Sequence, residues 1–276
     1  MKNIEHIVSP IATDLAWFET FFAQSLKAET EPMDSIMRYV LDTRGKRLRP
    51  ILVLLSARLL GKPGDKTLRA AAFVEIVHNA TLIHDDVVDD DDQRRNRASV
   101  KAHFGNLSAV LAGDYLLAQA MLLVANDADI LNEMMHTTAA MSEGELMQTI
   151  VGVSHHGSLN ESLNESGRYD VTAIQDQYLD IITRKTAMLM RSCCVAGALS
   201  VGATPEQVQQ IADFGLNFGI LFQLRDDLLD NENTELANVL LPEYLKKTLG
   251  SLQSFPDSEI LLVLRELTLF CAEREE

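Results

Sequence analysis

The stretch AAAFVEIVHNATLIHDDVVDDDD, residues 70–92, joins an apolar segment to a dense run of aspartates. Its apolar side chains recur every three or four residues, which predicts a helix. At about 100° per residue, Asp85 and Asp89 lie ~40° apart on such a helix, and Asp86 falls ~60° beyond Asp89. The three carboxylates would share one face, where their mutual repulsion is costly unless cations lie between them.

This first aspartate cluster offers the hard oxygen ligands that Mg²⁺ prefers. Mg²⁺ usually binds one or two carboxylates and completes its shell with water and substrate phosphate. Taken alone, the cluster fits a solvated acidic helix end or a weak Ca²⁺ site equally well.

A second stretch, FGILFQLRDDLLD at 218–230, repeats the spacing with Asp226, Asp227 and Asp230. It again ends an apolar segment, and charges within such a helix are expected to face a cavity or a metal. Two DDxxD units that face each other could hold several Mg²⁺ ions around one diphosphate. The two stretches together predict a metal-assisted site for a diphosphate substrate.

Basic residues are concentrated near these clusters, although the chain as a whole is acidic. They precede the apolar run that starts at residue 51 and follow the first aspartate cluster: Lys46, Arg47, Arg49, Arg94, Arg95 and Arg97. Guanidinium and ammonium groups beside carboxylates suit a polyanionic substrate. The alternative is simple ion pairing with the neighbouring aspartates.

Helical periodicity extends over most of the chain, and strand patterns are nearly absent. The segments with three- and four-residue spacing are 33–43, 48–60, 67–89, 107–125, 129–151, 174–200, 206–230 and 256–273. We therefore expect an all-α single domain, residues 1–276, with ten or more helices around a central substrate cavity. Residues 154–170 read as a polar loop.

Composition limits the class of function. The 24 Lys+Arg against 40 Asp+Glu give a formal charge of −16, which disfavours nucleic acid as a partner. The 3 cysteines have no metal-binding spacing and fit a reduced helical core. No signal peptide and no membrane-spanning run are predicted, so we expect a cytoplasmic protein.

The motifs, taken together, resemble those of the trans-isoprenyl diphosphate synthases, which include farnesyl, geranylgeranyl and longer polyprenyl diphosphate synthases. The resemblance covers roughly residues 30–230, with a weaker similarity at 242–273. Five motifs stand in the family's order: GKRLRP (45–50), LIHDDVVDDDDQRR (82–95), LAGDYLLAQA (111–120), RKTAML (184–189) and FQLRDDLLD (222–230).

The resemblance implies a head-to-tail condensation of isopentenyl diphosphate with an allylic diphosphate, in an all-α fold that usually dimerises. It implies three Mg²⁺ ions, with Mn²⁺ as a substitute, that help the allylic diphosphate to leave. The implied metal ligands are Asp85, Asp86, Asp89, Asp226, Asp227 and Asp230. Arg94 and Lys185 match residues that steady the allylic diphosphate.

The resemblance also implies a pocket for isopentenyl diphosphate. It would be formed by Lys46, Arg49, His78 and Arg95, with Gly45 allowing a close backbone approach. A satisfied core histidine is the alternative for His78. Thr186 and Gln223 match polar groups whose oxygens face the carbocation.

Product length is expected to depend on Ala80 and Thr81, one helical turn before Asp85. Short-chain members commonly carry a bulky aromatic there, so small side chains predict a product longer than C15.

The chain departs from the family after the second cluster. A few dozen residues, with a GKxTLP-like signature, are missing between about 230 and 240. Either they were lost or the sequence omits a flexible segment, and a true loss would favour a non-catalytic partner subunit of a heteromeric synthase. The first aspartate cluster is also compatible with a class I terpene cyclase or with an acidic divalent-ion binding protein.

Overall fold

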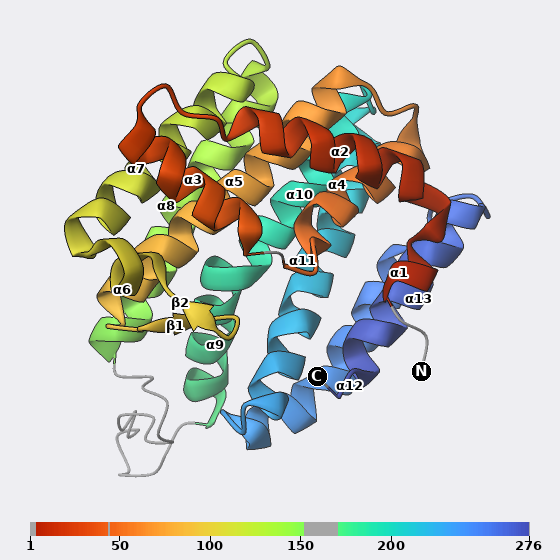
Figure 1. Cartoon of the computed structure of the whole chain (residues 1–276). Coiled ribbons are helices and arrows are strands. Elements are labelled where there is room, and N and C mark those ends of the chain that lie inside the picture. Colours follow the sequence, from red (N-terminus) through yellow and green to blue (C-terminus); the bar gives the residue numbers. More distant parts are fainter. Residues whose placement is uncertain (1–3, 44, 152–170, 276) are drawn as a thin grey trace.

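The computed structural model describes residues 4–43, 45–151 and 171–275. The polar loop predicted at 154–170 lies outside these residues, and so does Arg44. The described residues form an almost entirely helical bundle, which confirms the predicted all-α fold with more than ten helices (Figure 1).

The structure describes the following helices and strands. In chain order they are α1 (Ile4–Ile7), η1 (Ser9–Ile11), α2 (Ala12–Ser25), α3 (Glu31–Asp42), α4 (Leu48–Leu60), α5 (Asp65–Val88), β1 (Gln93–Arg94), β2 (Arg97–Ala98), α6 (Val100–Phe104), α7 (Asn106–Leu123), α8 (Ala128–Val151), α9 (Val171–Ile182), η2 (Thr183–Ala187), α10 (Met188–Ser200), α11 (Pro205–Leu229), α12 (Thr234–Ser251) and α13 (Glu259–Glu273).

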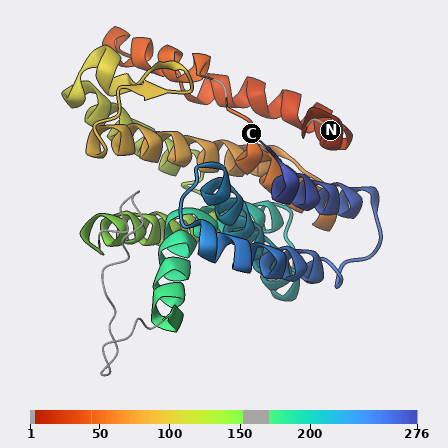
Figure 2. The same ribbon diagram turned by 90° about the horizontal axis from the view of Figure 1, so that it is seen from below.

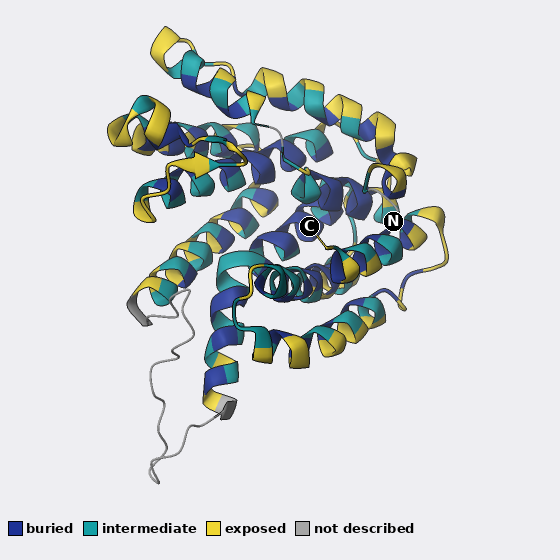
Figure 3. Ribbon diagram, turned by 60° about the horizontal axis from the view of Figure 1, so that its bottom comes forward, coloured by how far each residue is buried: buried dark blue, intermediate teal, exposed yellow. Residues whose placement is uncertain are grey.

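Helices α4 and α10 lie at the centre of the bundle. Residues 50–57 of α4 are all buried, and so are most residues of α10. Figure 2 shows α2 and α3 as an outer layer over α4 and α5, with α8 to α12 on the other side. Buried residues are concentrated on the central helices and exposed residues on the outer helices (Figure 3). Such all-round apolar helices are stable only when other helices cover them.

Each aspartate cluster lies at the carboxyl end of a long helix. Asp85 and Asp86 are in the last turn of α5, and Asp89 caps it. In α11, Asp226 and Asp227 are in the last turn and Asp230 is the cap. The carboxyl end of a helix carries partial negative charge and disfavours carboxylates. Both positions are therefore electrostatically unfavourable until a cation is supplied.

A short hairpin, β1–β2, follows the first cluster and was not predicted. Its two turn residues, Arg95 and Asn96, have φ values of 54° and 60°, as a two-residue type I′ turn requires. Asparagine tolerates this left-handed backbone better than most residues. Of the two arginines that flank the turn, Arg94 pairs with Asp86 of α5, while Arg97 stacks on the Tyr39 ring of α3, with its Cζ 3.7 Å from the ring centroid.

Helices α11 and α12 are joined by a tight turn. This turn lies where the chain, compared with the family it resembles, is expected to lack a few dozen residues. Asn231 and Asn233 adopt left-handed φ values of 59° and 42°, and the Glu232 N–H donates to the Asp227 carbonyl at 2.7 Å. The described chain thus runs from the second aspartate cluster directly into α12.

Among the described residues, one helix, α7, has the length and mean hydropathy (1.3) of a membrane span. This is weak evidence for a span, because the core helix of a soluble protein meets the same criteria. One side of α7 packs on α5, while Leu107, Leu111 and Leu122 are exposed.

Candidate active site

A cavity of about 230 Å³ lies between the start of α4, the middle of α5 and the ends of α11 and α13. It brings together four residues that the sequence assigns to one pocket, namely Lys46, Arg49, His78 and Arg95. Its other lining residues are Ile4, Arg47, Leu48, Glu75, Phe222, Leu267, Phe270, Cys271 and Arg274. The segments that meet here are more than 200 residues apart in the sequence.

Gly45 allows the Arg95 side chain to enter this cavity. A Cβ atom at Gly45 would lie 2.5 Å from Arg95 Nη1 and 2.7 Å from Cζ. Arg95 Nη1 donates to the Thr43 carbonyl at 3.2 Å, which holds the guanidinium in place. The close approach expected at Gly45 is therefore to an arginine of the same chain.

Replacing Gly45 with alanine is expected to displace the Arg95 guanidinium and leave the fold intact, because the atoms it meets end a flexible side chain. For isopentenyl diphosphate, the substrate that the family resemblance implies, we expect a rise of about tenfold in KM, the effect of one lost charged hydrogen bond, with a smaller change in kcat. Steady-state kinetics would measure both. Gly250→Ala is the control, because no atom lies within 4 Å of its added Cβ. An unchanged KM in Gly45→Ala would contradict the prediction.

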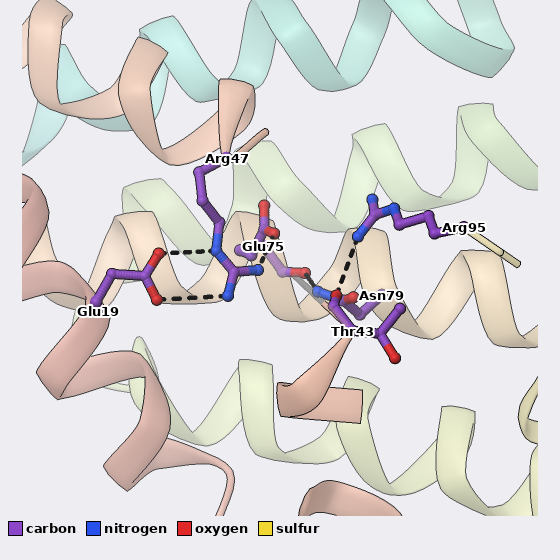
Figure 4. A network of polar contacts seen from close by, with 6 residues as sticks. All are labelled: Glu19, Thr43, Arg47, Glu75, Asn79 and Arg95. Atoms are coloured by element: carbon purple, nitrogen blue, oxygen red, sulfur yellow. Dashed lines mark hydrogen bonds and ion pairs between the residues drawn. The ribbon is translucent and has the colours of Figure 1, made fainter. Parts of the chain in front are cut away.

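A partly buried ion-pair network supports the basic end of the cavity (Figure 4). Arg47 Nε donates to Glu19 Oε1 at 2.9 Å, and Arg47 Nη1 donates to Glu75 Oε1 at 2.8 Å. Glu75 is 3% exposed, and its carbonyl accepts a hydrogen bond from Asn79 Nδ2 at 2.7 Å. Glu75 is thus the buried anion among several cations.

The electrostatics of the cavity favour an anionic ligand. Burial lowers the pKa of Arg49, and the neighbouring Arg95 lowers it further, against the opposing effect of Glu75. Burial also lowers the pKa of His78 well below its usual value, as do the positive charges of Arg49, Arg95 and Arg94. Neutral His78 therefore offers the cavity an uncharged ring, and the positive charge comes from lysine and arginine.

The carboxylates of the first aspartate cluster are only partly accessible to a ligand. Burial, with repulsion from Glu145 and Asp89, raises the pKa of Asp85 to about 6. Asp86 is 2% exposed, and its Oδ1 accepts a hydrogen bond from Arg94 Nε at 2.8 Å and pairs with Nη2. Asp89 is exposed. In this state Arg94 makes a simple ion pair with a neighbouring aspartate.

The second cluster is also held by protein groups. Asp226 Oδ1 accepts from Arg274 Nη2 at 2.5 Å. Asp227 accepts from the Tyr178 hydroxyl at 2.5 Å and from Gln223 Nε2 at 2.7 Å, and burial raises its pKa against these contacts. Asp230 is exposed at the end of α11.

Lys185 and Thr186 lie on a π-helical turn, η2, between α9 and α10. Such turns are rare and are frequent at functional sites. Lys185 Nζ pairs with Glu145 Oε2 at 2.8 Å, and the Thr186 hydroxyl donates to Gln223 Oε1 at 2.8 Å. The turn thus presents the lysine toward α8 and the threonine toward α11.

Two close helix contacts fix this turn. A Cβ at Gly219 would lie 2.5 Å from Ala187 Cα, and one at Gly144 would lie 2.8 Å from the Lys185 nitrogen. Backbone atoms cannot give way as a side chain can, so α8 and α11 require glycine at these positions.

Ala80 is completely buried in the core, and the Thr81 hydroxyl donates to the His78 carbonyl at 2.9 Å. Neither residue lines the cavity described above. Their role in product length stays a prediction.

Three contacts of the site could not be predicted from the sequence. These are Arg274 with Asp226, Tyr178 with Asp227, and Glu75 with Arg47. Each joins segments that are 28 or more residues apart. Only the contact of Glu75 with Arg47 left a signal in the sequence, because a glutamate inside the apolar segment 70–83 requires a buried partner.

Divalent cations suit the donor chemistry of the two clusters. All six carboxylates offer hard oxygens, and the raised pKa values of Asp85, Asp226 and Asp227 show charge that a cation would stabilise. Within residues 4–43, 45–151 and 171–275, no three His, Cys, Asp or Glu side chains are already gathered as a metal site. Ion pairs with arginine occupy part of each cluster.

Comparison with known proteins gives a consistent result. The family model described as polyprenyl synthetase matches residues 30–238. The octaprenyl diphosphate synthase of Escherichia coli is 32% identical over 228 residues, which are 83% of this chain and 66% of that protein. The heptaprenyl diphosphate synthase component 2 of Geobacillus stearothermophilus is 34% identical over 249 residues, which are 90% of this chain and 71% of that protein. The match to the Escherichia coli protein thus spans slightly less than two thirds of its length.

Solved structures of similar fold cover nearly the whole chain. A polyprenyl synthase from Caulobacter crescentus, complexed with calcium and isoprenyl diphosphate, has a TM-score of 0.86 at 24% identity, over 99% of this chain and 98% of that one. The geranylgeranyl pyrophosphate synthetase of Geoglobus acetivorans has a TM-score of 0.81 at 26% identity, over 96% and 100% of the two chains.

Proposed function

Because this chain belongs to the polyprenyl synthetase family, we propose that it is a prenyltransferase that condenses isopentenyl diphosphate with an allylic diphosphate. The observation that carries the proposal is the cavity lined by Lys46, Arg49 and Arg95, which is linked to the second aspartate cluster through the contact of Arg274 with Asp226. This set of cations has no use in a one-substrate cyclase, which needs no second diphosphate site. It therefore favours a two-substrate condensation over cyclisation of a single substrate.

We propose Mg²⁺ as the cofactor, with Mn²⁺ as a substitute. Asp85, Asp86 and Asp89 on α5, with Asp226, Asp227 and Asp230 on α11, are the residues that would hold it. Bound there, the ion supplies Lewis-acid stabilisation of the negative charge that develops on the leaving diphosphate. The donor chemistry and the raised pKa values support this assignment.

The basic residues of the chain would bind and orient both diphosphates. In the proposed complex, Arg94 leaves its ion pair with Asp86 and steadies the allylic diphosphate together with Lys185. Lys46, Arg49 and Arg95 hold the diphosphate of isopentenyl diphosphate in the cavity, with neutral His78 as a hydrogen-bonding partner. Both substrates are thereby fixed in one geometry, which lowers the entropic barrier to condensation.

Thr186 and Gln223 would face the allylic carbocation. Their mutual hydrogen bond leaves oxygen lone pairs on uncharged groups, which stabilise positive charge without the nucleophilicity of a carboxylate. The proton lost in the last step would go to the released diphosphate, so no side chain is assigned as the base.

A product longer than C15 is proposed from the small residue Ala80 and from the octaprenyl and heptaprenyl names of the relatives. Ala80→Tyr is expected to shorten the product while condensation continues, because the added ring would lie one turn below Asp85. Chromatography of the dephosphorylated products would measure this. Ala80→Val, with a smaller added volume, should shift the product less, and an unchanged distribution in both variants would contradict the role of this position.

We also propose a homodimer in the cytoplasm. The exposed apolar residues of α7, including Leu107 and Leu111, support an interface, since such patches seldom stay in water. The three cysteines are all free, as expected in a reducing compartment. The particle mass in solution, by light scattering, tests the dimer.

One assay tests the proposed function against the competing ones. The protein is incubated with Mg²⁺, labelled isopentenyl diphosphate and allylic diphosphates of increasing length, and the products are sized. Chain extension supports the synthase, and hydrocarbon release from a single substrate supports a terpene cyclase.

Absence of any product would favour the non-catalytic subunit, which a true deletion near residues 230–240 would suggest, or a divalent-ion binding protein. The intact mass of the natural protein would decide whether that segment is missing.

A further inference from the structure

Arg274 lies just after α13 and sends its side chain into the cavity. Its side chain is only 9% exposed. Nη2 donates to Asp226 Oδ1 at 2.5 Å and to the Phe222 carbonyl at 3.4 Å, and Cζ lies 4.2 Å from the centroid of the Phe222 ring. The arginine thus lies between the isopentenyl diphosphate pocket and the second aspartate cluster.

The backbone of Arg274 is fixed, and its side chain has a free donor. Its carbonyl accepts from Arg225 Nε at 2.8 Å and from Arg225 Nη2 at 2.5 Å, and its N–H donates to the Phe270 carbonyl at 3.0 Å. Arg274 Nε is buried and has no hydrogen-bond partner. Arg49 Nε, in the same cavity, is likewise buried without a partner.

Two unpartnered guanidinium donors in one cavity are costly, because a buried charged donor loses its water without a replacement. Among the described residues, the anion of this cavity is Glu75, which already accepts from Arg47. Neither donor has an acceptor among the described residues, which leaves room for one from a bound ligand. A diphosphate, with several oxygens and several negative charges, is the ligand that would serve both.

A divalent cation bound to Asp226 would repel the guanidinium that pairs with its Oδ1 and would weaken that ion pair. We propose, as an extension of the proposed function, that Arg274 is a shared cation. In the metal-free protein it neutralises Asp226. When a metal ion binds Asp226, the guanidinium is released to the diphosphate of isopentenyl diphosphate. Metal loading of one subsite thereby completes the other.

The proposal predicts effects of opposite sign from one substitution. In Arg274→Met, the affinity for Mn²⁺ without substrate should rise about tenfold, because a competing ion pair is lost. The affinity for labelled isopentenyl diphosphate in the presence of Mg²⁺ should fall about tenfold or more, the effect of a lost charged hydrogen bond. Electron paramagnetic resonance of free Mn²⁺ and equilibrium dialysis measure the two, and neither requires turnover.

Arg265→Met is the matched control. Arg265 lies on α13, the helix that Arg274 follows, and it pairs with exposed Asp257 at 4.0 Å without lining the cavity. It should change neither affinity. A merely structural role of Arg274 would weaken both affinities or leave both unchanged, and either result overturns the proposal.

Asp226→Asn decides the question if Arg274→Met does not fold. It frees the guanidinium without removing it, so metal-free binding of isopentenyl diphosphate should tighten several-fold relative to the wild type. No gain would overturn the proposal. If the wild-type protein extends chains but the variants show none of these changes in affinity, the shared cation is refuted and the proposed function stands. If the changes in affinity occur but the wild-type protein extends no chain, the proposed function is refuted and the shared cation stands.

Discussion

Asp85→Asn is expected to lower the rate of chain extension by about a thousandfold or more and to raise the melting temperature of the metal-free protein at neutral pH. The loss follows from the removal of one metal ligand, since metal-ion stabilisation of a leaving group is worth several kcal/mol and each ~1.4 kcal/mol is a factor of ten. The gain in stability follows from the surroundings of the carboxylate.

Burial first, and then repulsion by Glu145 and Asp89, raises the pKa of Asp85 from 3.8 to about 6. Between these two values the folded protein binds more protons than the unfolded chain, so stability falls as the pH rises through this window. Above about pH 6 the ionised Asp85 destabilises the metal-free fold, by about 1–2 kcal/mol after allowance for solvent screening. Asparagine removes that cost, and Mg²⁺ should do the same for the wild type.

Calorimetry of the metal-free proteins across this pH window and a chain-extension assay check the two effects. Asp91→Asn is the matched control, because Asp91 belongs to the same run of aspartates and is exposed. It should alter neither the rate nor the melting temperature by much. Equal losses of activity in the two variants would refute the specific role of Asp85.

The largest effect on stability is expected from Glu75→Gln. Glu75 is 3% exposed and pairs with Arg47, while Arg49 and Arg95 also feel its charge. Removing one partner of a buried pair leaves an uncompensated charge and costs about 3–5 kcal/mol. We expect the lower end of this range in the free energy of unfolding, because Glu19 still pairs with Arg47.

Denaturant unfolding measures this loss, and inorganic diphosphate provides a second readout. The variant cavity carries one negative charge fewer, so diphosphate should bind it more tightly and raise its melting temperature more than that of the wild type. Glu19→Gln is the matched control, because Glu19 contacts the same arginine but its side chain is 43% exposed. A loss in Glu75→Gln no larger than in Glu19→Gln would contradict the role of burial.

Much of the fold could be predicted from the sequence because its information is local. The three- and four-residue spacing of apolar residues defines α5 and α11, and the aspartates at their ends follow directly in the chain. The pocket formed by Lys46, Arg49, His78 and Arg95 was also expected, because the chain resembles a family in which these motifs form one pocket.

Other features depend on backbone geometry that apolar periodicity does not encode. The type I′ turn at Arg95 and Asn96 has no glycine, so its usual sequence signal is missing. The π-helical turn at Lys185 depends on how closely Gly144 and Gly219 let neighbouring helices approach. Neither requirement can be recognised from the residues of one segment alone.

The helical bundle, the two aspartate clusters and the concentration of basic residues near them in the chain follow from local sequence patterns. The pairing of each cation with its carboxylate depends on how the helices pack: Arg94 pairs with Asp86, Arg274 with Asp226 and Arg47 with Glu75. Charges interact over a few ångströms of space, whatever their separation in the sequence. Arg274 and Asp226 are 48 residues apart, and the packing of α13 on α11 brings them into contact.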